Sequence, residues 1–244
     1  MKIIRNLPGF VTLFKDARFF NKNLHRIEDA RAAGDFEEER KWILDSTSTF
    51  GTMFMEHFNI DYNLHGEENI PDEGPVVIVA NHQGYADIPA LFAAFTKFQF
   101  GFIAKEELGK IPLYGPWMLR IRSIFIDRDD PRASLRTIKK GIEYLNNGFS
   151  LVIFPEGTRA KCSVPGEFMK GSLKLATKAG VPIVPVTIDG TCKFFEDKGY
   201  MVKGARFDVT IHEPIPTKGI TREEEKTLSD KVRDIIVSAL PAVE

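Results

Sequence analysis

Cysteine is scarce in this sequence, and no long apolar run occurs in it. The 244 residues include two cysteines, Cys162 and Cys192, and neither belongs to a CxxC pair. Two cysteines without a CxxC pair indicate neither a zinc site nor a disulfide framework, so we expect two reduced thiols in a cytosolic protein. No run approaches the roughly 18–20 apolar residues of a membrane span. The short run at residues 7–14 meets charged residues at once, without a cleavage site, which argues against a signal peptide.

An excess of positive charge and the common nucleotide or nucleophile motifs are also lacking. The formal net charge is -1, which disfavours a nucleic-acid-binding protein. Neither a P-loop nor a G-x-S-x-G turn occurs, so no serine or cysteine has motif support as a covalent nucleophile. The 43% of hydrophobic residues indicates a folded globular chain rather than a disordered one.

The chain divides into two parts, residues 1–58 and residues 59–244. The first part predicts two helices, one within residues 2–27 and one at residues 36–58. The second part alternates short apolar runs with helical patterns, which predicts an α/β domain with a central, mostly parallel sheet flanked by helices. The runs do not alternate, so we expect most strands to be covered on both faces. Expected strands are 76–80, 100–104, 123–126, 151–154, 183–188 and 207–212; expected helices are 88–97, 131–146, 169–178 and 221–240, the last with a Thr221/Glu224 capping box.

A histidine and an aspartate five positions apart, His82 and Asp87, follow the first of these runs. Histidine suits proton transfer near neutral pH, and a carboxylate partner fixes its tautomer. Five positions do not share one helix face. The pair therefore meets only if His82 lies in a turn and Asp87 opens the next helix, which Gly84 and Pro89 favour. An ordinary loop histidine and a helix N-cap fit the same spacing, which leaves both interpretations open.

Cations follow three other expected strands, at Lys105, Arg128 and Arg159. The carboxyl ends of strands in open α/β sheets form ligand sites, so three converging cations favour a phosphate pocket over three unrelated surface charges. Next to Arg159, the residues Glu156-Gly157-Thr158 supply a flexible backbone and a hydroxyl for anionic oxygens. Asp127, Asp129 and Asp130 resemble metal ligands, but the interleaved Arg128 and the following Pro131 favour a solvated turn without a metal.

Four blocks occur in the order typical of one family: 81–87 (Asn-His-x-x-x-x-Asp), 124–128 (Ile-Phe-Ile-Asp-Arg), 154–159 (Phe-Pro-Glu-Gly-Thr-Arg) and 181–186 (Val-Pro-Ile-Val-Pro-Val). With them the sequence resembles the glycerolipid acyltransferases typified by the bacterial 1-acylglycerol-3-phosphate acyltransferases, over residues 59–188. The resemblance implies that His82 and Asp87 form the catalytic pair. It implies that Lys105, Arg128 and Arg159 hold the acceptor phosphate, and that Glu156, Gly157 and Thr158 shape the acceptor site.

Residues 2–26 carry six basic residues against one acid, Asp16, and four phenylalanines among other large apolar residues. Cations mixed with large apolar groups are typical of helices that lie in a membrane interface. We therefore expect peripheral, monotopic binding to the cytoplasmic face of the cell membrane through the first helix, and core packing for most of the second. An ordinary helical hairpin that covers the sheet is the alternative.

The expected activity is transfer of a fatty acyl group from acyl-CoA or acyl carrier protein to the free hydroxyl of 1-acylglycerol-3-phosphate, which forms phosphatidic acid. His82 acts as general base, and the transfer uses no metal or other cofactor. Another lysolipid acceptor is the alternative within the family. A noncatalytic peripheral lipid-binding protein needs no base–carboxylate pair, and a lipid hydrolase is disfavoured by the missing nucleophile turn. The donor, the chain length and the oligomeric state stay open.

Overall fold

The computed structural model describes residues 2–20, 23–127, 130–162, 164–169 and 171–241. Within these residues the strands form one seven-stranded sheet in the order β1-β7-β6-β2-β5-β3-β4. Only the neighbours β6 and β7 pair antiparallel in it. The expected mostly parallel sheet is therefore confirmed. The strands are β1 (Asp61–His65), β2 (Val77–Ala80), β3 (Phe100–Lys105), β4 (Ile124–Ile126), β5 (Ser150–Ile153), β6 (Ile183–Asp189) and β7 (Arg206–Ile211).

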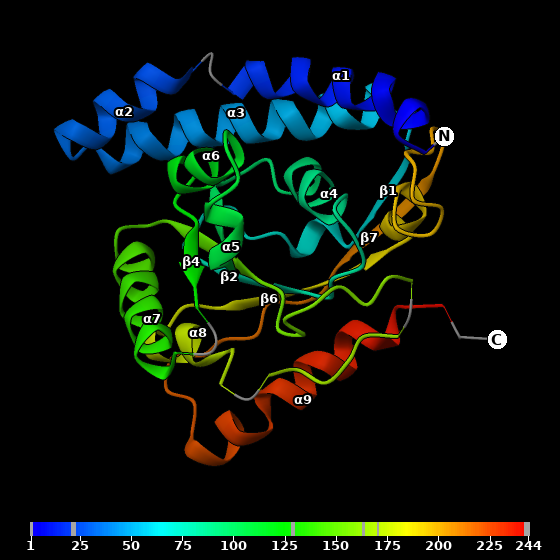
Figure 1. Cartoon of the computed structure of the whole chain (residues 1–244). Coiled ribbons are helices and arrows are strands. Elements are labelled where there is room, and N and C mark those ends of the chain that lie inside the picture. Colours follow the sequence, from blue (N-terminus) through cyan, green and yellow to red (C-terminus); the bar gives the residue numbers. More distant parts are fainter. Residues whose placement is uncertain (1, 21–22, 128–129, 163, 170, 242–244) are drawn as a thin grey trace.

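Helices cover both faces of this sheet, as Figure 1 shows, with α1 to α4 on one side and α8 and α9 on the other. Every residue of β2 and β5 is buried, which explains why both strands read as continuous apolar runs. The helices of this part are α4 (Asp87–Ala94), α5 (Glu106–Gly109), α6 (Tyr114–Arg120), α7 (Pro131–Asn146), α8 (Lys174–Ala179) and α9 (Arg222–Ser238), with short 3-10 turns η2 (Glu67–Asn69) and η3 (Thr191–Phe194).

Some elements differ from the expectation. Helix α8 begins at Lys174 rather than near residue 169. Strand β1 has no apolar run that would predict it; its place is set by parallel pairing with β7, in which Tyr62 lies opposite Phe207. The capping box at Thr221 and Glu224 is present at the start of α9, as predicted.

In the amino-terminal part, residues 2–20 and 23–58 form three helices rather than two: α1 (Lys2–Phe20), α2 (Leu24–Ala33) and α3 (Phe36–His57). Asn23, which is buried, precedes α2. Its side-chain amide donates to Asp45 Oδ2 (2.6 Å) and Ser46 Oγ (3.2 Å) of α3. An asparagine bound in this way favours a helix boundary over a helix interior. Gly34, with a positive φ of 71°, then ends α2.

Helix α3 packs on α4, and its residues Ile43, Thr47 and Phe54 are buried, which confirms core packing for the second expected helix. At Gly51 the two helices approach so closely that a Cβ would lie 2.5 Å from the backbone nitrogen of Ala93. None of the helices in the described parts of the chain combines the length and the hydropathy that crossing a bilayer requires.

Helix α1 is attached to the rest of the molecule by polar contacts near both ends. The backbone N–H of Met201 donates to Asn6 Oδ1 (2.8 Å), and the Asn6 amide donates to the carbonyl of Gly199 (3.3 Å). Toward the other end, the buried carboxylate of Asp16 lies 3.0 Å from Nδ1 of His57 on α3. The single acid of this segment therefore faces α3 rather than solvent.

Candidate functional site

The chain leaves the sheet directly after β2, at Asn81. Its side-chain amide donates to the carbonyl of Ile188 (2.8 Å), and its amide oxygen accepts the Ile188 N–H (2.8 Å). This buried asparagine thus completes the backbone hydrogen bonds of β6 where β2 ends. The next residue, His82, lies in the turn between β2 and α4.

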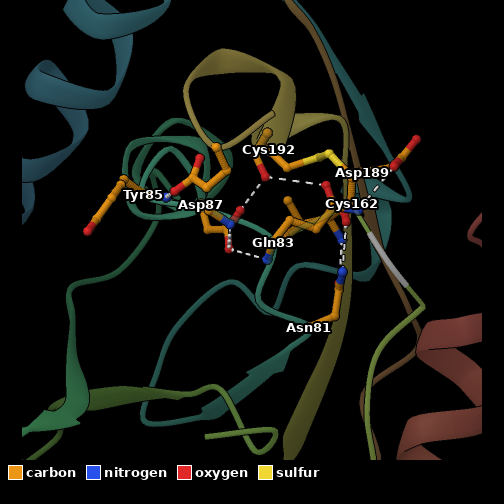
Figure 2. The surroundings of a disulfide bond; sticks show 11 residues. Asn81, Gln83, Tyr85, Asp87, Cys162, Asp189 and Cys192 are labelled. Atoms are coloured by element: carbon orange, nitrogen blue, oxygen red, sulfur yellow. Dashed lines mark hydrogen bonds between the residues drawn. A yellow bond between two sulfur atoms is a disulfide. The ribbon is translucent and has the colours of Figure 1, made fainter. Parts of the chain in front are cut away.

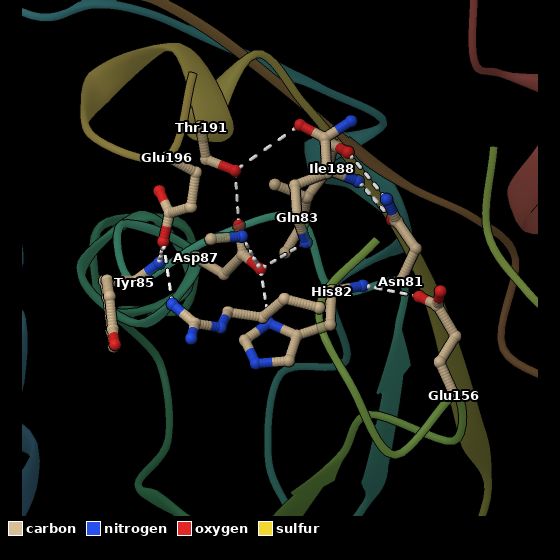
Figure 3. Close-up of polar contacts among 11 residues, drawn as sticks. Asn81, His82, Gln83, Tyr85, Asp87, Glu156, Ile188, Thr191 and Glu196 are labelled. Carbon is tan, nitrogen blue, oxygen red and sulfur yellow. Dashed lines mark hydrogen bonds and ion pairs between the residues drawn. The ribbon is translucent and has the colours of Figure 1, made fainter. Parts of the chain in front are cut away.

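His82 and Asp87 are in direct contact, as Figure 3 shows: Nδ1 of His82 lies 2.6 Å from Oδ2 of Asp87. Asp87 is the first residue of α4, so the pair meets across a strand, a turn and a helix start, as the spacing predicts. Asp87 is fully buried, and its Oδ2 also accepts the backbone N–H groups of Gln83 (2.7 Å) and Gly84 (3.0 Å). A buried carboxylate held by donors favours the Nδ1–H tautomer of His82 and leaves Nε2 as the basic nitrogen.

Two further contacts fix the orientation of His82. Its ring stacks on Phe154 with a centroid distance of 4.1 Å. Its backbone N–H donates to Oε1 of Glu156 (2.8 Å), whose Oε2 accepts the N–H of Gly166 (3.0 Å). Burial raises the pKa of the Glu156 carboxyl above its usual value, although both N–H donors favour its charged form. Glu156 therefore links the turn at His82 to the loop at Gly166.

A groove with a volume of about 1010 Å³ opens beside His82 and is mostly apolar. One wall comes from α1 and α3, through Phe10, Phe14 and Phe50. Of the residues expected to bind substrate, Lys105, Gly157, Thr158 and Arg159 line this groove together with His82. Arg128 lies outside the described residues. The structure therefore brings four of the expected binding residues to one groove. Glu156 does not line the groove and instead accepts the backbone N–H of His82.

Three residues of the site were not anticipated: Tyr85, Thr191 and Glu196. The Thr191 hydroxyl donates a short hydrogen bond to Oδ1 of Asp87. Glu196 Oε1 accepts from Nη1 of Arg159 (3.0 Å), and the Arg159 guanidinium lies 3.9 Å above the Tyr85 ring. Thr191 follows β6, so the rule that ligands gather beyond strand ends points to it. No sequence signal marks Glu196.

The two cysteines form a disulfide, which corrects the expectation of two reduced thiols. Cys162 and Cys192 are 30 positions apart in sequence, and their Cα atoms are 5.6 Å apart, within the range that a disulfide spans. The fold makes this pair, because η3 returns to the loop that follows Arg159. Figure 2 shows the bond beside Asp87 and Gln83, so it ties together the two loops that complete the site.

Asp130 has a structural role. Its carboxylate accepts the N–H of Arg132 (2.8 Å) at the start of α7 and pairs with Arg136 (3.3 Å). Both contacts lower the pKa of the Asp130 carboxyl, the backbone hydrogen bond most. This agrees with the expected turn and helix start at the acidic run. Asp129 lies outside the described residues.

A mostly parallel sheet with a histidine–aspartate pair and an apolar groove at its strand ends defines an α/β protein with a candidate catalytic site. The chain belongs to the acyltransferase family, whose model, described as Acyltransferase, matches residues 61–189, more than half of the chain. Over its full length the fold is similar to the crystal structure of the 1-acyl-sn-glycerophosphate (LPA) acyltransferase PlsC from Thermotoga maritima, with a TM-score of 0.73, 31% identity and 100% of each chain covered.

Sequence relatives carry related names. A chloroplastic 1-acyl-sn-glycerol-3-phosphate acyltransferase of Arabidopsis thaliana is 38% identical over 63% of this chain and 43% of its own length. A Chlamydomonas reinhardtii protein of the same name is 34% identical over 97% of this chain and 66% of its own length. The chain therefore spans less than two thirds of these relatives. A relative of that name from Borreliella burgdorferi is 33% identical over 73% of this chain and 71% of its own length.

Proposed function

We propose that the protein transfers a fatty acyl group from an acyl thioester to the free hydroxyl of 1-acylglycerol-3-phosphate and so forms phosphatidic acid. The observation that carries the proposal is the His82–Asp87 pair at 2.6 Å, set in an apolar groove that also holds a guanidinium, that of Arg159. A base, an anion-binding cation and an apolar channel are the three features that a phosphate-bearing lysolipid acceptor requires. The names of the relatives and of the structural neighbour agree with this acceptor.

The reaction proceeds by direct attack. The acceptor hydroxyl oxygen forms a bond to the thioester carbonyl carbon while its proton passes to Nε2 of His82. Asp87 stabilises the imidazolium that results. Collapse of the tetrahedral intermediate breaks the carbon–sulfur bond, and the leaving thiolate takes the proton from His82. The donor is acyl-CoA or acyl carrier protein, and both supply the same thioester.

Lys105 and Arg159 bind the acceptor phosphate by charge-assisted hydrogen bonds, and Gly157 and Thr158 shape the surface beside it. Arg128 belongs to the same proposed set by its sequence position. The acyl chain of the acceptor lies in the apolar part of the groove, whose lining includes Phe10 and Phe14 of α1. An acyl chain that stays in this lining does not need to enter water during the reaction.

The same groove opens toward a proposed membrane surface. Leu7, Phe10, Val11 and Phe14 of α1 are between 46% and 59% exposed, and Ile111 and Leu113 on the α5–α6 loop are 45% and 72% exposed. Phe10, Phe14, Ile111 and Leu113 also line the groove. Exposed apolar groups around a lipid-sized opening are typical of interfacial insertion. We place this rim on the cytoplasmic face of the cell membrane.

The test is an assay of the purified protein with acyl-CoA and acyl carrier protein donors against 1-acylglycerol-3-phosphate and a panel of other lysolipids. We expect phosphatidic acid as the product. His82→Ala should reduce the turnover number by a factor of ~10²–10⁴, because the general base is lost, while circular dichroism shows an unchanged fold. Near-wild-type turnover in that folded variant would exclude His82 as the base, and exclusive use of another acceptor would exclude 1-acylglycerol-3-phosphate as the substrate.

A further inference from the structure

A buried carboxylate, that of Glu196, lies beside the proposed phosphate subsite. Its side chain is 4% exposed, and it follows η3, beyond the residues 61–189 that the family model matches. One oxygen, Oε1, accepts two hydrogen bonds, from Nη1 of Arg159 (3.0 Å) and from the backbone N–H of Tyr85 (2.8 Å). Glu196 therefore joins the loop that carries Arg159 to the turn between His82 and Asp87. Figure 3 shows Glu196 beside Tyr85 of this turn.

The second oxygen of Glu196, Oε2, is buried and has no hydrogen-bond partner among the described residues. It lies against Gly84, where a Cβ would come within 2.5 Å of it. Any larger residue at position 84 would push the carboxylate away, so the glycine makes room for the acid. Burying a carboxylate with one unsatisfied oxygen costs folding free energy, so stability alone does not explain Glu196. Its position on Arg159 points to a role at the groove.

Arg159 is held from two sides. Tyr85 covers one face of its guanidinium at 3.9 Å, and Glu196 binds its Nη1. The side chain keeps 29% of its surface exposed and lines the groove with His82. A guanidinium has five N–H donors in a rigid plane. Fixing one nitrogen and one face sets the direction of the remaining donors, which is what two-point binding of a phosphate needs.

We propose that Glu196 is a positioning residue for the acceptor-phosphate subsite, which holds the Arg159 guanidinium against Tyr85 so that its remaining donors meet the phosphate. The inference rests on the proposed function, since it needs a phosphate-bearing acceptor. Glu196 also adds negative charge near the phosphate, and charge alone would weaken acceptor binding. If Glu196 acts by orienting Arg159, its removal raises the KM for the phosphate-bearing acceptor. If it acts by its charge alone, its removal lowers that KM, so kinetic measurements distinguish the two effects.

The experiment compares Glu196→Ala, Glu196→Gln and Arg159→Ala with the wild type, using 1-acylglycerol-3-phosphate and, as a phosphate-free acceptor, 1-monoacylglycerol. Glu196→Ala should raise the KM for the phosphate acceptor about tenfold, the usual effect of losing one charge-assisted contact. The turnover number, the donor KM and kcat/KM for monoacylglycerol should each change less than about threefold. A general structural defect would instead lower activity with both acceptors. Glu196→Gln keeps an oxygen for Arg159 and should show a smaller rise.

Asp197→Ala is the matched control, because it removes the adjacent, exposed carboxylate, and it should match the wild type. The double variant Glu196→Ala/Arg159→Ala should be no worse than Arg159→Ala alone, since Glu196 acts through Arg159. A lower acceptor KM in Glu196→Ala, additive effects in the double variant, or equal losses with both acceptors would overturn the inference. An Arg159→Ala effect without a Glu196→Ala effect refutes only this inference, whereas a wild type that does not acylate 1-acylglycerol-3-phosphate refutes the proposed function as well.

Discussion

At the residue scale, the carboxylate of Asp87 accepts four hydrogen bonds, from His82, Gln83, Gly84 and Thr191. The first three donors lie within five positions of Asp87, so a sequence pattern can reveal them. Thr191 is 104 positions away and reaches Asp87 only because β6 lies beside β2 in the sheet. The sequence therefore predicts the pair, whereas the donors that complete it depend on tertiary structure.

The Thr191 hydroxyl is the basis of one prediction. Thr191→Val keeps the shape of the side chain but removes a donor to a buried charge, a contact worth ~1.5–3 kcal/mol. Asp87 then holds His82 less firmly, and we expect the turnover number to fall roughly tenfold. Thr191→Ser keeps the donor and should retain most of the activity. Steady-state kinetics and the thermal midpoint are the measurements; equal activity of the valine and serine variants would contradict this role.

At the element scale, the strands with buried faces on both sides were predictable from their apolar runs, whereas the edge strand β1 was not. β2, β5 and β6 consist almost wholly of buried residues, so their apolar runs identify them. β1 reads Asp-Tyr-Asn-Leu-His, with no buried residue, and owes its conformation to β7. Likewise, the start of α2 follows Asn23, whose side chain is bound to α3, and local periodicity does not report such contacts.

Three elements meet at His212, which follows β7. The Thr187 hydroxyl of β6 donates to the carbonyl of Ile236 in α9 (2.6 Å), so His212 must donate from Nε2 to Thr187 Oγ1 (2.8 Å). Burial lowers the pKa of His212 below its ordinary 6.5. The unfolded chain therefore binds a proton at His212 more readily than the folded chain does. The stability that the neutral ring contributes is present above pH 6.5 and is lost as pH falls through the folded pKa.

We therefore expect His212→Gln, which keeps a donor but does not titrate, to lose less stability than the wild type when pH falls from about 7 to 5. Urea unfolding at several pH values measures the difference between the two proteins. His25→Gln, at an exposed position of α2, is the control and should follow the wild-type curve. Parallel pH profiles of the wild type and His212→Gln would show that His212 does not contribute to acid destabilisation.

At the scale of the whole molecule, the Cys162–Cys192 disulfide closes a loop of 30 positions between two segments of the site. By the chain-entropy relation, a loop of this length stabilises the folded state by ~3–4 kcal/mol. Dithiothreitol should therefore lower the thermal midpoint of the wild type and leave that of the Cys162→Ser/Cys192→Ser double variant unchanged. If non-reduced protein contained two free thiols by mass spectrometry, the bond and its effect on stability would both be absent.

The rim of the groove carries the last prediction, which concerns how the whole molecule meets a bilayer. On the described part of α1 the exposed residues include the apolar Leu7, Phe10, Val11 and Phe14 and the basic Lys15. The only acid of this helix, Asp16, is turned inward to His57. Insertion of Phe10 and Phe14 gives a free energy that salt does not screen, whereas attraction of the basic residues to anionic lipid is screened over about 10 Å at 0.1 M salt. Raising the salt concentration should therefore weaken vesicle binding without abolishing it.

The variant Phe10→Ser/Phe14→Ser should lose that salt-resistant fraction, because both side chains are about half exposed and their replacement leaves the core intact. Co-sedimentation with anionic and neutral vesicles over a salt series is the measurement, with Thr52→Ala on the exposed side of α3 as the control. Activity on bilayer-embedded acceptor should fall much more than activity on a short-chain soluble acceptor, since the His82 site is untouched. A serine variant that sediments like the wild type at every salt concentration would place the membrane contact elsewhere on the molecule.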